Sequence, residues 1–575
     1  MKKHLCLALA ALAFAACDKE TDPVGPVEKG EMEQSYLAVS LLADDMATRA
    51  AGDEYEDGDA SERVVKNFYF FLFDEKGQPF EIDGKTNYKA VEINESENDF
   101  GNNKPTAPEG DTNETPNTPE GDENGENTDP EGGENNDPEG DENGERPSGE
   151  DAPNVSDIKD KVLVFENYKG EYPAKIVAVL NWTPATDAVY TLDALAEQLA
   201  GLKNTDDAFV MSNSVYASES SNPDAGKEAI KATPLSPANI AKSEEDALAN
   251  PVQIYVERIA AKVTVNTTAE NKYETGEVIG GKKVYAQVTG WDLHNAYNTS
   301  YLIKQIDPTW TGASVGFSWN DAAWFRSYWA KSPTTAFGAD NKASFNTLTN
   351  AVGASDYCGE NTYRTEGERT MVVVKAQLVD ENGTSVEVAS WYGHDYVGEE
   401  ALRTVVANTL ASQLYYMDGT EYKSIEPAHL MVKEADEHPN PDPDMKPYHV
   451  FFQLSTAGEA KEWYTYSTTE GFKVSTKEAV NVILGGVEPA LLYKSGQTYY
   501  FTDIKHLPST KPETQYGVVR NHVYKVNITS IAGLGTPVFD GNTQFVPVKP
   551  EDITTYVSAE VRVLSWRVVE HDYDI

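Results

Sequence analysis

Residues 252–265 read VQIYVERIAAKVTV, and they indicate most clearly how the chain folds. Apolar residues alternate with polar ones around Glu257-Arg258, which is the pattern of strands with one face against a core. The full chain has 575 residues, too many for one ordinary core. We therefore place a domain junction here, with an N-terminal domain over residues 50–260 and a C-terminal domain over residues 261–575.

Short strand-like segments recur on both sides of this junction. Tyr, Thr and Val are abundant, and Gly, Pro and Asn turns separate the segments, which favours a β-sandwich over a parallel sheet. Leu192, Leu195, Leu199 and Leu202 fall on one helical face and predict a short helix packed on a sheet. The predicted fold is mainly β, with two tandem β-sandwich domains and a few short helices. The predicted strands include residues 64–73, 162–165, 174–182, 283–288, 370–378, 449–454, 498–504 and 523–528.

The chain is strongly acidic, with a formal net charge of -47 at pH 7. Such a charge repels nucleic acid and anionic lipid, so neither is expected as a ligand. Residues 95–151 consist almost entirely of Glu, Asp, Asn, Gly, Pro and Thr and predict a disordered acidic insertion in a surface loop. Its Asp-Glu-Asn-Gly runs lack the spacing and the closing Glu of a calcium loop, so a solvated linker is the favoured interpretation.

Residues 1–17 have the features of a secretory signal peptide. Two lysines precede an apolar stretch from Leu5 to Ala16, which is too short to span a membrane as a helix. The run Phe14-Ala15-Ala16-Cys17 resembles a bacterial lipobox, which implies that Cys17 is acylated and becomes the new N-terminus. The alternative is an ordinary signal peptide that ends near a chance cysteine. In the lipobox interpretation, the lipid of the precursor is its only attachment to a membrane.

The sequence contains no recognisable catalytic or metal-binding pattern. It has no G-x-S-x-G, H-E-x-x-H or Walker run, and its histidines are scattered without the spacing of metal ligands. Cys358 is the only cysteine outside the N-terminal segment, so no disulfide forms within the mature chain. A buried free thiol is favoured over a nucleophile at this position. We therefore expect no enzyme, no cofactor and no metal site.

One strand, residues 36–42, is predicted ahead of the N-terminal domain. Its residues on one face are Leu37, Val39 and Leu41. A polar, exposed segment follows in which Arg49 is the only basic residue. Cleavage between Arg49 and Ala50 would release residues 18–49, a propeptide that carries both the lipid and the strand. The apolar groove left behind could then accept a strand from another molecule by β-augmentation.

A second strand, residues 556–569, is predicted at the other end of the chain. Residues 541–555 look like an extended connector that leads to it. Two interpretations stay open: the strand completes its own sheet, or it leaves to fill the groove of another molecule. Five or six large side chains in such a groove would contribute roughly 10 kcal/mol before ordering costs. The apolar positions are Val557, Ala559, Val561 and Val563, followed after a change of phase by Trp566 and Val568.

The chain resembles the major fimbrial subunits, or fimbrillins, of type V pili in Bacteroidales. The resemblance implies two transthyretin-like β-sandwich domains, removal of the N-terminal strand by an arginine-specific extracellular protease, and insertion of another subunit's C-terminal strand into the vacated groove. The acidic insertion departs from the family and leaves the boundaries of the first domain open. The matching segments are the lipobox at Cys17, Thr48-Arg49-Ala50-Ala51-Gly52, residues 516–528 (YGVVRNHVYKVNI), Gly533-Leu534-Gly535 and residues 561–568 (VRVLSWRV).

The expected function is that of a polymerising structural subunit. The precursor would be a lipoprotein of the outer membrane, and the product an extracellular fimbrium that supports adhesion and biofilm formation. Expected partners are other copies of the chain, accessory tip and anchor subunits, and host or bacterial surface ligands. Two alternatives remain: a fimbrial tip or anchor subunit, and a surface glycan-binding lipoprotein with an aromatic platform. The platform residues would be Trp319, Trp324 and Trp329.

Overall fold

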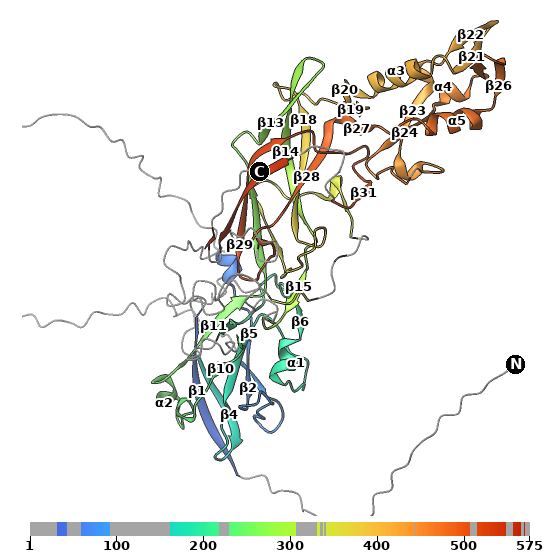
Figure 1. Ribbon diagram of the computed structural model, residues 1–575. Coiled ribbons are helices and arrows are strands. Elements are labelled where there is room, and N and C mark those ends of the chain that lie inside the picture. Colours follow the sequence, from blue (N-terminus) through green and yellow to red (C-terminus); the bar gives the residue numbers. More distant parts are fainter. Residues whose placement is uncertain are drawn as a thin grey trace, which may run out of the picture.

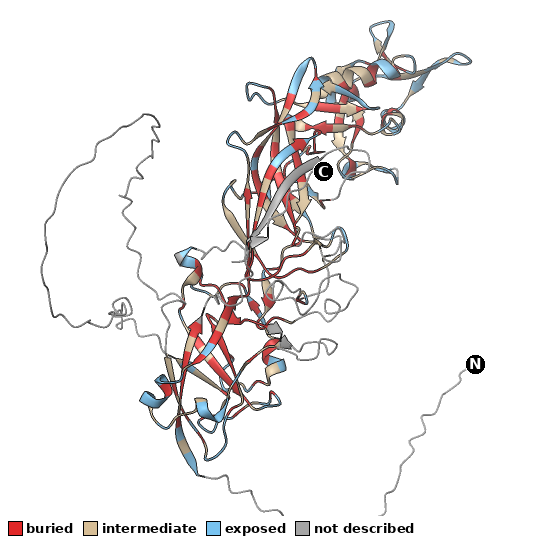
Figure 2. Cartoon of the chain, turned by 60° about the vertical axis from the view of Figure 1, so that its left-hand side comes forward, coloured by how far each residue is buried: buried red, intermediate tan, exposed pale blue. Residues whose placement is uncertain are grey.

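The computed structural model of the chain is mostly β (Figure 1). Its sheets surround three separate hydrophobic cores of substantial size, whereas the sequence predicted two sandwiches. Figure 2 shows the buried residues concentrated in the strands and the exposed ones in the connecting turns. The structure describes residues 31–42, 59–91, 161–217, 229–305, 330–333, 337, 341–441, 443–506, 515–547, 556–564 and 568–569.

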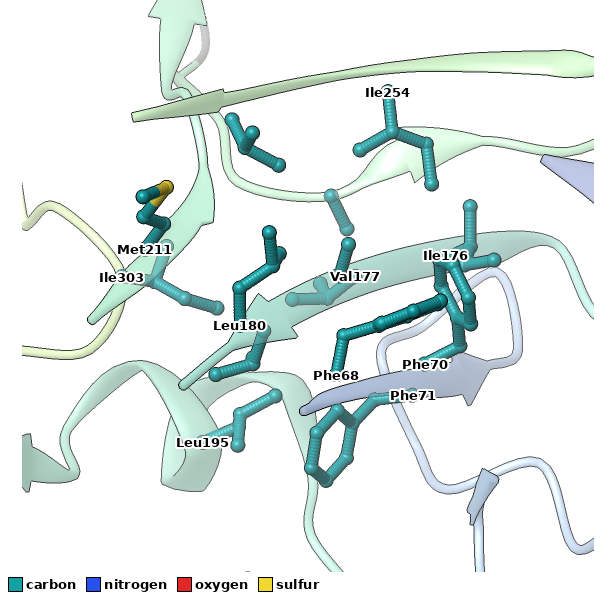
Figure 3. Close-up of a cluster of buried hydrophobic side chains, with 14 of the residues drawn as sticks. Phe68, Phe70, Phe71, Ile176, Val177, Leu180, Leu195, Met211, Ile254 and Ile303 are labelled. Carbon is teal, nitrogen blue, oxygen red and sulfur yellow. The ribbon is translucent and has the colours of Figure 1, made fainter. Parts of the chain in front are cut away.

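The first core lies under an eight-stranded sheet of order β3-β2-β5-β7-β11-β1-β4, with β10 paired to β5. The two ends of this sheet approach each other, because β3 contacts β4. Side chains from β2, β5, β7, β11 and the short helix α1 meet inside it (Figure 3). The elements are β1 (Met32–Leu42), β2 (Phe68–Phe73), β3 (Tyr88–Val91), β4 (Lys161–Tyr168), β5 (Lys175–Leu180), α1 (Leu192–Ala196), β7 (Met211–Asn213), β10 (Thr233–Pro234), α2 (Glu244–Leu248) and β11 (Val252–Arg258).

The helix predicted over Leu192 to Leu202 is shorter than expected. Thr191 caps α1 by accepting a hydrogen bond from the Ala194 backbone N–H, and the helix ends at Ala196. Residues Leu199–Gly201 then form β6, which pairs with β15 (Thr299–Tyr301). The prediction for Leu199 was wrong, because it is 47 % exposed rather than packed on the sheet.

The second core lies between two five-stranded sheets and makes a β-sandwich. One sheet has the order β17-β12-β29-β32-β33 and the other β13-β14-β18-β28-β30. The elements are β12 (Ala261–Asn266), β13 (Lys272–Ile279), β14 (Lys282–His294), β17 (Ser355–Cys358), β18 (Met371–Val379), β28 (Gln497–Asp503), β29 (Val523–Ala532), β30 (Thr536–Pro537), β32 (Tyr556–Leu564) and β33 (Val568–Val569).

The third core belongs to a smaller unit inserted between β18 and β28, and we call residues 388–493 the third unit. It was not predicted from the sequence, which placed its strand at 449–454 in the C-terminal sandwich. Helices α3 and α5 pack in it beside short sheets. The elements are β19 (Val388–Trp391), β20 (His394–Val397), α3 (Gly398–Leu410), β21 (Leu414–Asp418), β22 (Glu421–Ser424), β23 (Leu430–Glu434), β24 (Val450–Leu454), α4 (Thr456–Glu459), β25 (Trp463–Ser467), β26 (Gly471–Ser475), α5 (Lys477–Gly485) and β27 (Leu491–Tyr493).

The stretch at residues 252–265 is divided into two strands by Ile259 and Ala260. Ala260 belongs to the first core, and the next residue, Ala261, belongs to the second. Strand β11 therefore pairs in one sheet and β12 in the other. The chain passes from one hydrophobic core to the next within this single link.

Candidate functional site

Strand β1 lies inside the first sheet rather than at its edge. Residues Met32 to Val39 pair antiparallel with β4, and residues Val39 to Leu42 pair parallel with β11. The strand is longer than the predicted 36–42 because its first residues extend along β4. Since it has neighbours on both sides, its loss would leave two strands with unpaired backbone groups.

The apolar face of β1 is buried as the alternation predicted. Leu37, Val39 and Leu41 are at most 2 % exposed and belong to the first core. Ser35 occupies the preceding position on the same face and is also buried. Three large aliphatic side chains therefore fill the slot, fewer than the five or six assumed from the sequence.

The segment before α2 pairs with the first half of β1, on the side that β11 leaves unpaired. The backbone N–H of Tyr36 donates to the carbonyl of Ala241 at 3.0 Å, and the N–H of Ala241 donates back at 2.8 Å. Helix α2 itself contacts both β1 and β4. This cover was not predicted, because residues 237–250 show no regular apolar pattern.

The described residues on either side of residues 43–58 both lie at the domain junction. Leu42 pairs with Tyr255, three positions before Arg258 on β11. On the other side, the backbone carbonyl of Glu62 accepts a hydrogen bond from Arg258 Nε at 2.7 Å. Leu42 and Glu62, which lie before and after Arg49 and Ala50 in the sequence, thus both contact β11.

Glu62 is the centre of a buried polar cluster at this junction. Its Oε1 lies 2.7 Å from Lys262 Nζ and accepts a hydrogen bond from the Tyr357 hydroxyl. Burial lowers the pKa of Lys262, but hydrogen bonding and the charges of Glu62 and Asp59 outweigh burial, so its pKa is raised overall. Burial lowers the pKa of Arg258 to about 10, and the charge of Arg63 adds to this effect. The cluster holds Asp59 and Glu62 against residues of both domains.

The C-terminal strand β32 lies at the outer side of the second sandwich. It pairs antiparallel with β29 from Val523↔Leu564 to Ala532↔Tyr556, with an irregularity near Ile528. On its other side, among the described residues, the two-residue strand β33 alone pairs with it, at Val563 and Leu564. The structure therefore has the strand in its own sheet, which is the first of the two interpretations left open by the sequence.

The run at residues 516–528 forms β29 and the turn before it. Asn521 has a positive φ of 57°, its N–H donates to the Ala260 carbonyl, and the carbonyl of His522 accepts from Lys262. These bonds fix the start of β29 to the link between β11 and β12. As predicted, the run is a core strand with its turn.

Arg520, in the same turn, is completely buried and was not singled out from the sequence. Its Nε and Nη2 atoms lie 2.9 Å and 2.7 Å from Glu360 Oε2. Its Nη2 also donates to the carbonyl of Tyr301 at 2.6 Å. A lone arginine among valines in a strand-like run could have been suspected of such a role, because buried arginines are almost always paired.

Cys358 is buried with a free thiol, as predicted. Burial raises the pKa of this thiol, which disfavours the nucleophilic thiolate. In the described part of the chain, no three or more His, Cys, Asp or Glu side chains are grouped to hold a metal ion. No helix within the described ranges is both long and apolar enough to cross a membrane.

Several predicted sites lie outside the described residues. These are Cys17, Arg49, Ala50, Trp566, the acidic insertion at 95–151, and the three tryptophans Trp319, Trp324 and Trp329. For β32 and β33 the backbone pairing is described. The predictions for these sites stay predictions.

Comparison with known proteins identifies the C-terminal part of the chain. Residues 491–572 match the family model described as "Major fimbrial subunit protein type IV, Fimbrillin, C-terminal". This segment runs from β27 through β28 and β29 to the terminal strand. The resemblance to fimbrillins is confirmed over it, and the chain carries the C-terminal segment of a fimbrial-subunit family. No curated protein matches the sequence.

Solved structures of fimbrial and adhesion proteins align over most of the chain at low similarity. A fimbrilin (FimA) from Porphyromonas gingivalis W83 has 14% identity and a TM-score of 0.35, with 93% of this chain and 98% of that chain covered. A putative cell adhesion protein from Parabacteroides distasonis has 14% identity, a TM-score of 0.32, and coverage of 92% and 96%. The tip fimbrial protein Mfa3 from P. gingivalis has 12% identity, a TM-score of 0.26, and coverage of 93% and 100%. TM-scores below 0.5 do not establish a shared arrangement of domains.

Proposed function

We propose that the chain is the structural subunit of a surface fibre that polymerises by strand exchange. The precursor is exported as a lipoprotein acylated at Cys17 and is cleaved between Arg49 and Ala50. Strand β1 then leaves, and the C-terminal strand of a second copy takes its place. The fibre supports adhesion and biofilm formation at the cell surface, with tip and anchor subunits at its ends.

The observation that carries this proposal is the position of β1. It is an internal strand of the first sheet, and the next described element along the chain is the short helix Ala60–Arg63, on the far side of the predicted cleavage site at Arg49. One cut at that site disconnects the strand without touching the cores. An internal strand that can be removed by one cut creates a groove with an unpaired ladder on each side.

The exchange is favourable because the terminal strand gains a neighbour. In the part of the chain that the structure describes, β32 is paired along its length on one side, by β29, and at Val563 and Leu564 on the other. In the vacated groove, the same backbone would lie between β4 and β11. Each additional net hydrogen bond contributes about 0.5–1.5 kcal/mol.

The spacing of apolar residues in the terminal strand suits the groove. The buried face of β1 offers four alternate positions, at Ser35, Leu37, Val39 and Leu41. Refilling the three large positions contributes about 5–9 kcal/mol at 1.5–3 kcal/mol for each side chain, before ordering costs. The terminal strand has four apolar residues at the same spacing, Val557, Ala559, Val561 and Val563.

The proposal is tested by cleaving the purified precursor with an arginine-specific protease. We expect a new N-terminus at Ala50 and, in detergent gels without boiling, ladders of linked subunits. The matched control Arg49→Lys keeps the charge but removes the protease site, and it should give no ladder. A chain that lacks residues 556–575 should be cleaved and remain monomeric. Ladders in either control, or a cleaved parent that stays monomeric, would contradict the mechanism.

The alternative of a tip or anchor subunit gains support from the pairing of β32 with β29. A subunit at the end of a fibre needs a groove but no exported strand, and its terminal strand can stay in its own sheet. Such a subunit would be cleaved at Ala50 and accept the terminal strand of another protein, yet would never form ladders by itself. The same experiment therefore separates the two roles.

A further inference from the structure

The third unit has a sheet face that no other described element covers. The four strands β22-β21-β25-β26 place one face on the third core, through Leu414, Tyr416 and Trp463. The alternation along the strands puts eight residues on the opposite face, which we call the aromatic face. They are Tyr415, Met417, Tyr422, Ser424, Tyr464, Tyr466, Phe472 and Val474.

The rings of the aromatic face gather above the centre of the sheet. Tyr422 and Phe472 come from the two opposite edge strands, and their rings stack with centroids 3.9 Å apart and 5° between planes. Tyr415 and Tyr464 pack edge-on against this pair. Even so, Tyr422 and Phe472 remain 42% and 38% exposed, and Val474 is 79% exposed.

None of these eight side chains is charged, in a chain of which 25% of residues are charged. The neighbouring lysines Lys423 and Lys473 occupy alternate positions and pair with acidic residues of their own hairpins, Asp418 and Glu470. The face is thus an uncharged surface of aromatic rings and hydroxyls, and the two lysines lie on the reverse side of the sheet. An exposed aromatic cluster of this kind is typical of an interaction site.

We propose that the aromatic face binds the same face on a second copy of the chain and joins neighbouring fibres side by side. This inference rests on the proposed function, because it assumes that copies are arrayed along a polymer. Its partner is an identical surface related by a two-fold axis.

The charge of the protein favours this partner. Two chains that each carry -47 repel one another wherever acidic surfaces meet, and a contact through uncharged faces avoids placing like charges together. A tyrosine hydroxyl both donates and accepts hydrogen bonds, so two identical tyrosine-rich faces can satisfy one another. A strongly charged partner would find no counter-charge on the face.

The size of the face explains why it would act between fibres and not between monomers. Four strands about 4.8 Å apart, with two outward residues each, offer roughly a few hundred Å². A stable pair of proteins needs about 800 Å² from each partner. A single contact is therefore weak, but a polymer repeats the face once per subunit and gains affinity through multivalency.

The position of the face leaves strand exchange unobstructed. In Figure 1, β21, β22 and β26 lie at the end of the molecule opposite β1 and away from β29. A contact there does not compete with the groove or with the terminal strand. Lateral pairing and polymerisation can therefore proceed independently.

The test uses multivalent display without polymerisation. Precursor chains with the change Arg49→Ala, which cannot be processed, are attached by an N-terminal biotin at high density to streptavidin microspheres. We expect the microspheres to cluster, as measured by light scattering, while the same chain free in solution at micromolar concentration stays monomeric. Because strand exchange is blocked, this result does not depend on the ladder experiment.

Two matched variants identify the surface. Val474→Glu adds a carboxylate to the aromatic face, and Val482→Glu adds one on α5, where Val482 is 76% exposed. Neither removes a buried side chain, so both should fold. We expect Val474→Glu to reduce clustering at least tenfold and Val482→Glu to leave it near the parent level. Parent microspheres that stay dispersed, or two variants that behave alike, would overturn the proposal.

Discussion

The structure explains why position 535 is a glycine. Its φ is 77°, in the left-handed region that side chains disfavour. A Cβ there would lie 2.8 Å from the Tyr500 ring and 2.9 Å from the Tyr499 carbonyl oxygen. Strand β28 passes so close that only a glycine fits. The Gly533-Leu534-Gly535 motif therefore keeps the end of β29 tight against the opposite sheet.

We expect Gly535→Ala to destabilise the second sandwich by about 2 kcal/mol or more beyond the strain of a positive φ. The control is Gly383→Ala, where φ is 80° and nothing lies within 4 Å of the added Cβ. That change carries only backbone strain, about 1–2 kcal/mol. Urea unfolding of both variants measures the difference. Equal losses would mean that the backbone near β28 yields freely.

If strand β1 is a removable part of the first sheet, a separate peptide with its sequence should bind in its place. A synthetic peptide of residues 32–42, added in excess during protease treatment, should occupy the vacated groove and shorten or abolish the ladders. The matched peptide with serine in place of Leu37, Val39 and Leu41 keeps the backbone ladder but loses the buried side chains. It should inhibit at least tenfold less, given about 1.5–3 kcal/mol for each lost side chain. Equal inhibition by both peptides would contradict a side-chain-specific groove.

The elements that could be predicted from the sequence are those whose apolar residues all face one large hydrophobic core. Strands β1, β11 and β12 follow their period-two pattern because one face of each meets a large hydrophobic core. Strand β5 has no such alternation: it is a continuous apolar run that is buried from Ile176 to Leu180. The prediction of a helix over residues 192–202 was wrong after Ala196. Leu199–Gly201 pair as a strand with β15 through backbone hydrogen bonds, which no side-chain pattern indicates. Tertiary context overrode a helical spacing of leucines.

The third unit could not be predicted for a related reason. Its strands are five residues or fewer, so each shows only two or three inward positions. Helix α3 starts after Val397 without a side-chain cap, which removes the usual signal for a helix beginning. The groove walls were missed as well, because pairing of β1 with both β4 and β11 joins segments far apart in the chain.

A buried ion pair between Arg520 and Glu360 lies at the junction of the two large domains, and the arginine also reaches the first core. Arg520 belongs to the turn before β29, whereas Leu302, whose carbonyl it contacts at 3.3 Å, belongs to the first core. Its partner Glu360 is 1% exposed in its side chain. The second carboxylate oxygen, Oε1, has no hydrogen-bond partner among the described residues. The pair is therefore sensitive to the loss of either member.

We expect Arg520→Met to cost about 3–5 kcal/mol, because it leaves the Glu360 carboxylate buried and unpaired. Calorimetry should then show the two domains unfolding in separate transitions at temperatures where the parent unfolds as one. The double variant Arg520→Met with Glu360→Leu removes the orphaned charge and should recover at least half of the loss. No recovery would mean that the arginine acts through its bonds to the carbonyls of Tyr301 and Leu302. In the proposed fibre the groove lies in one domain and the terminal strand in the other, so force along the fibre passes through this junction in either case.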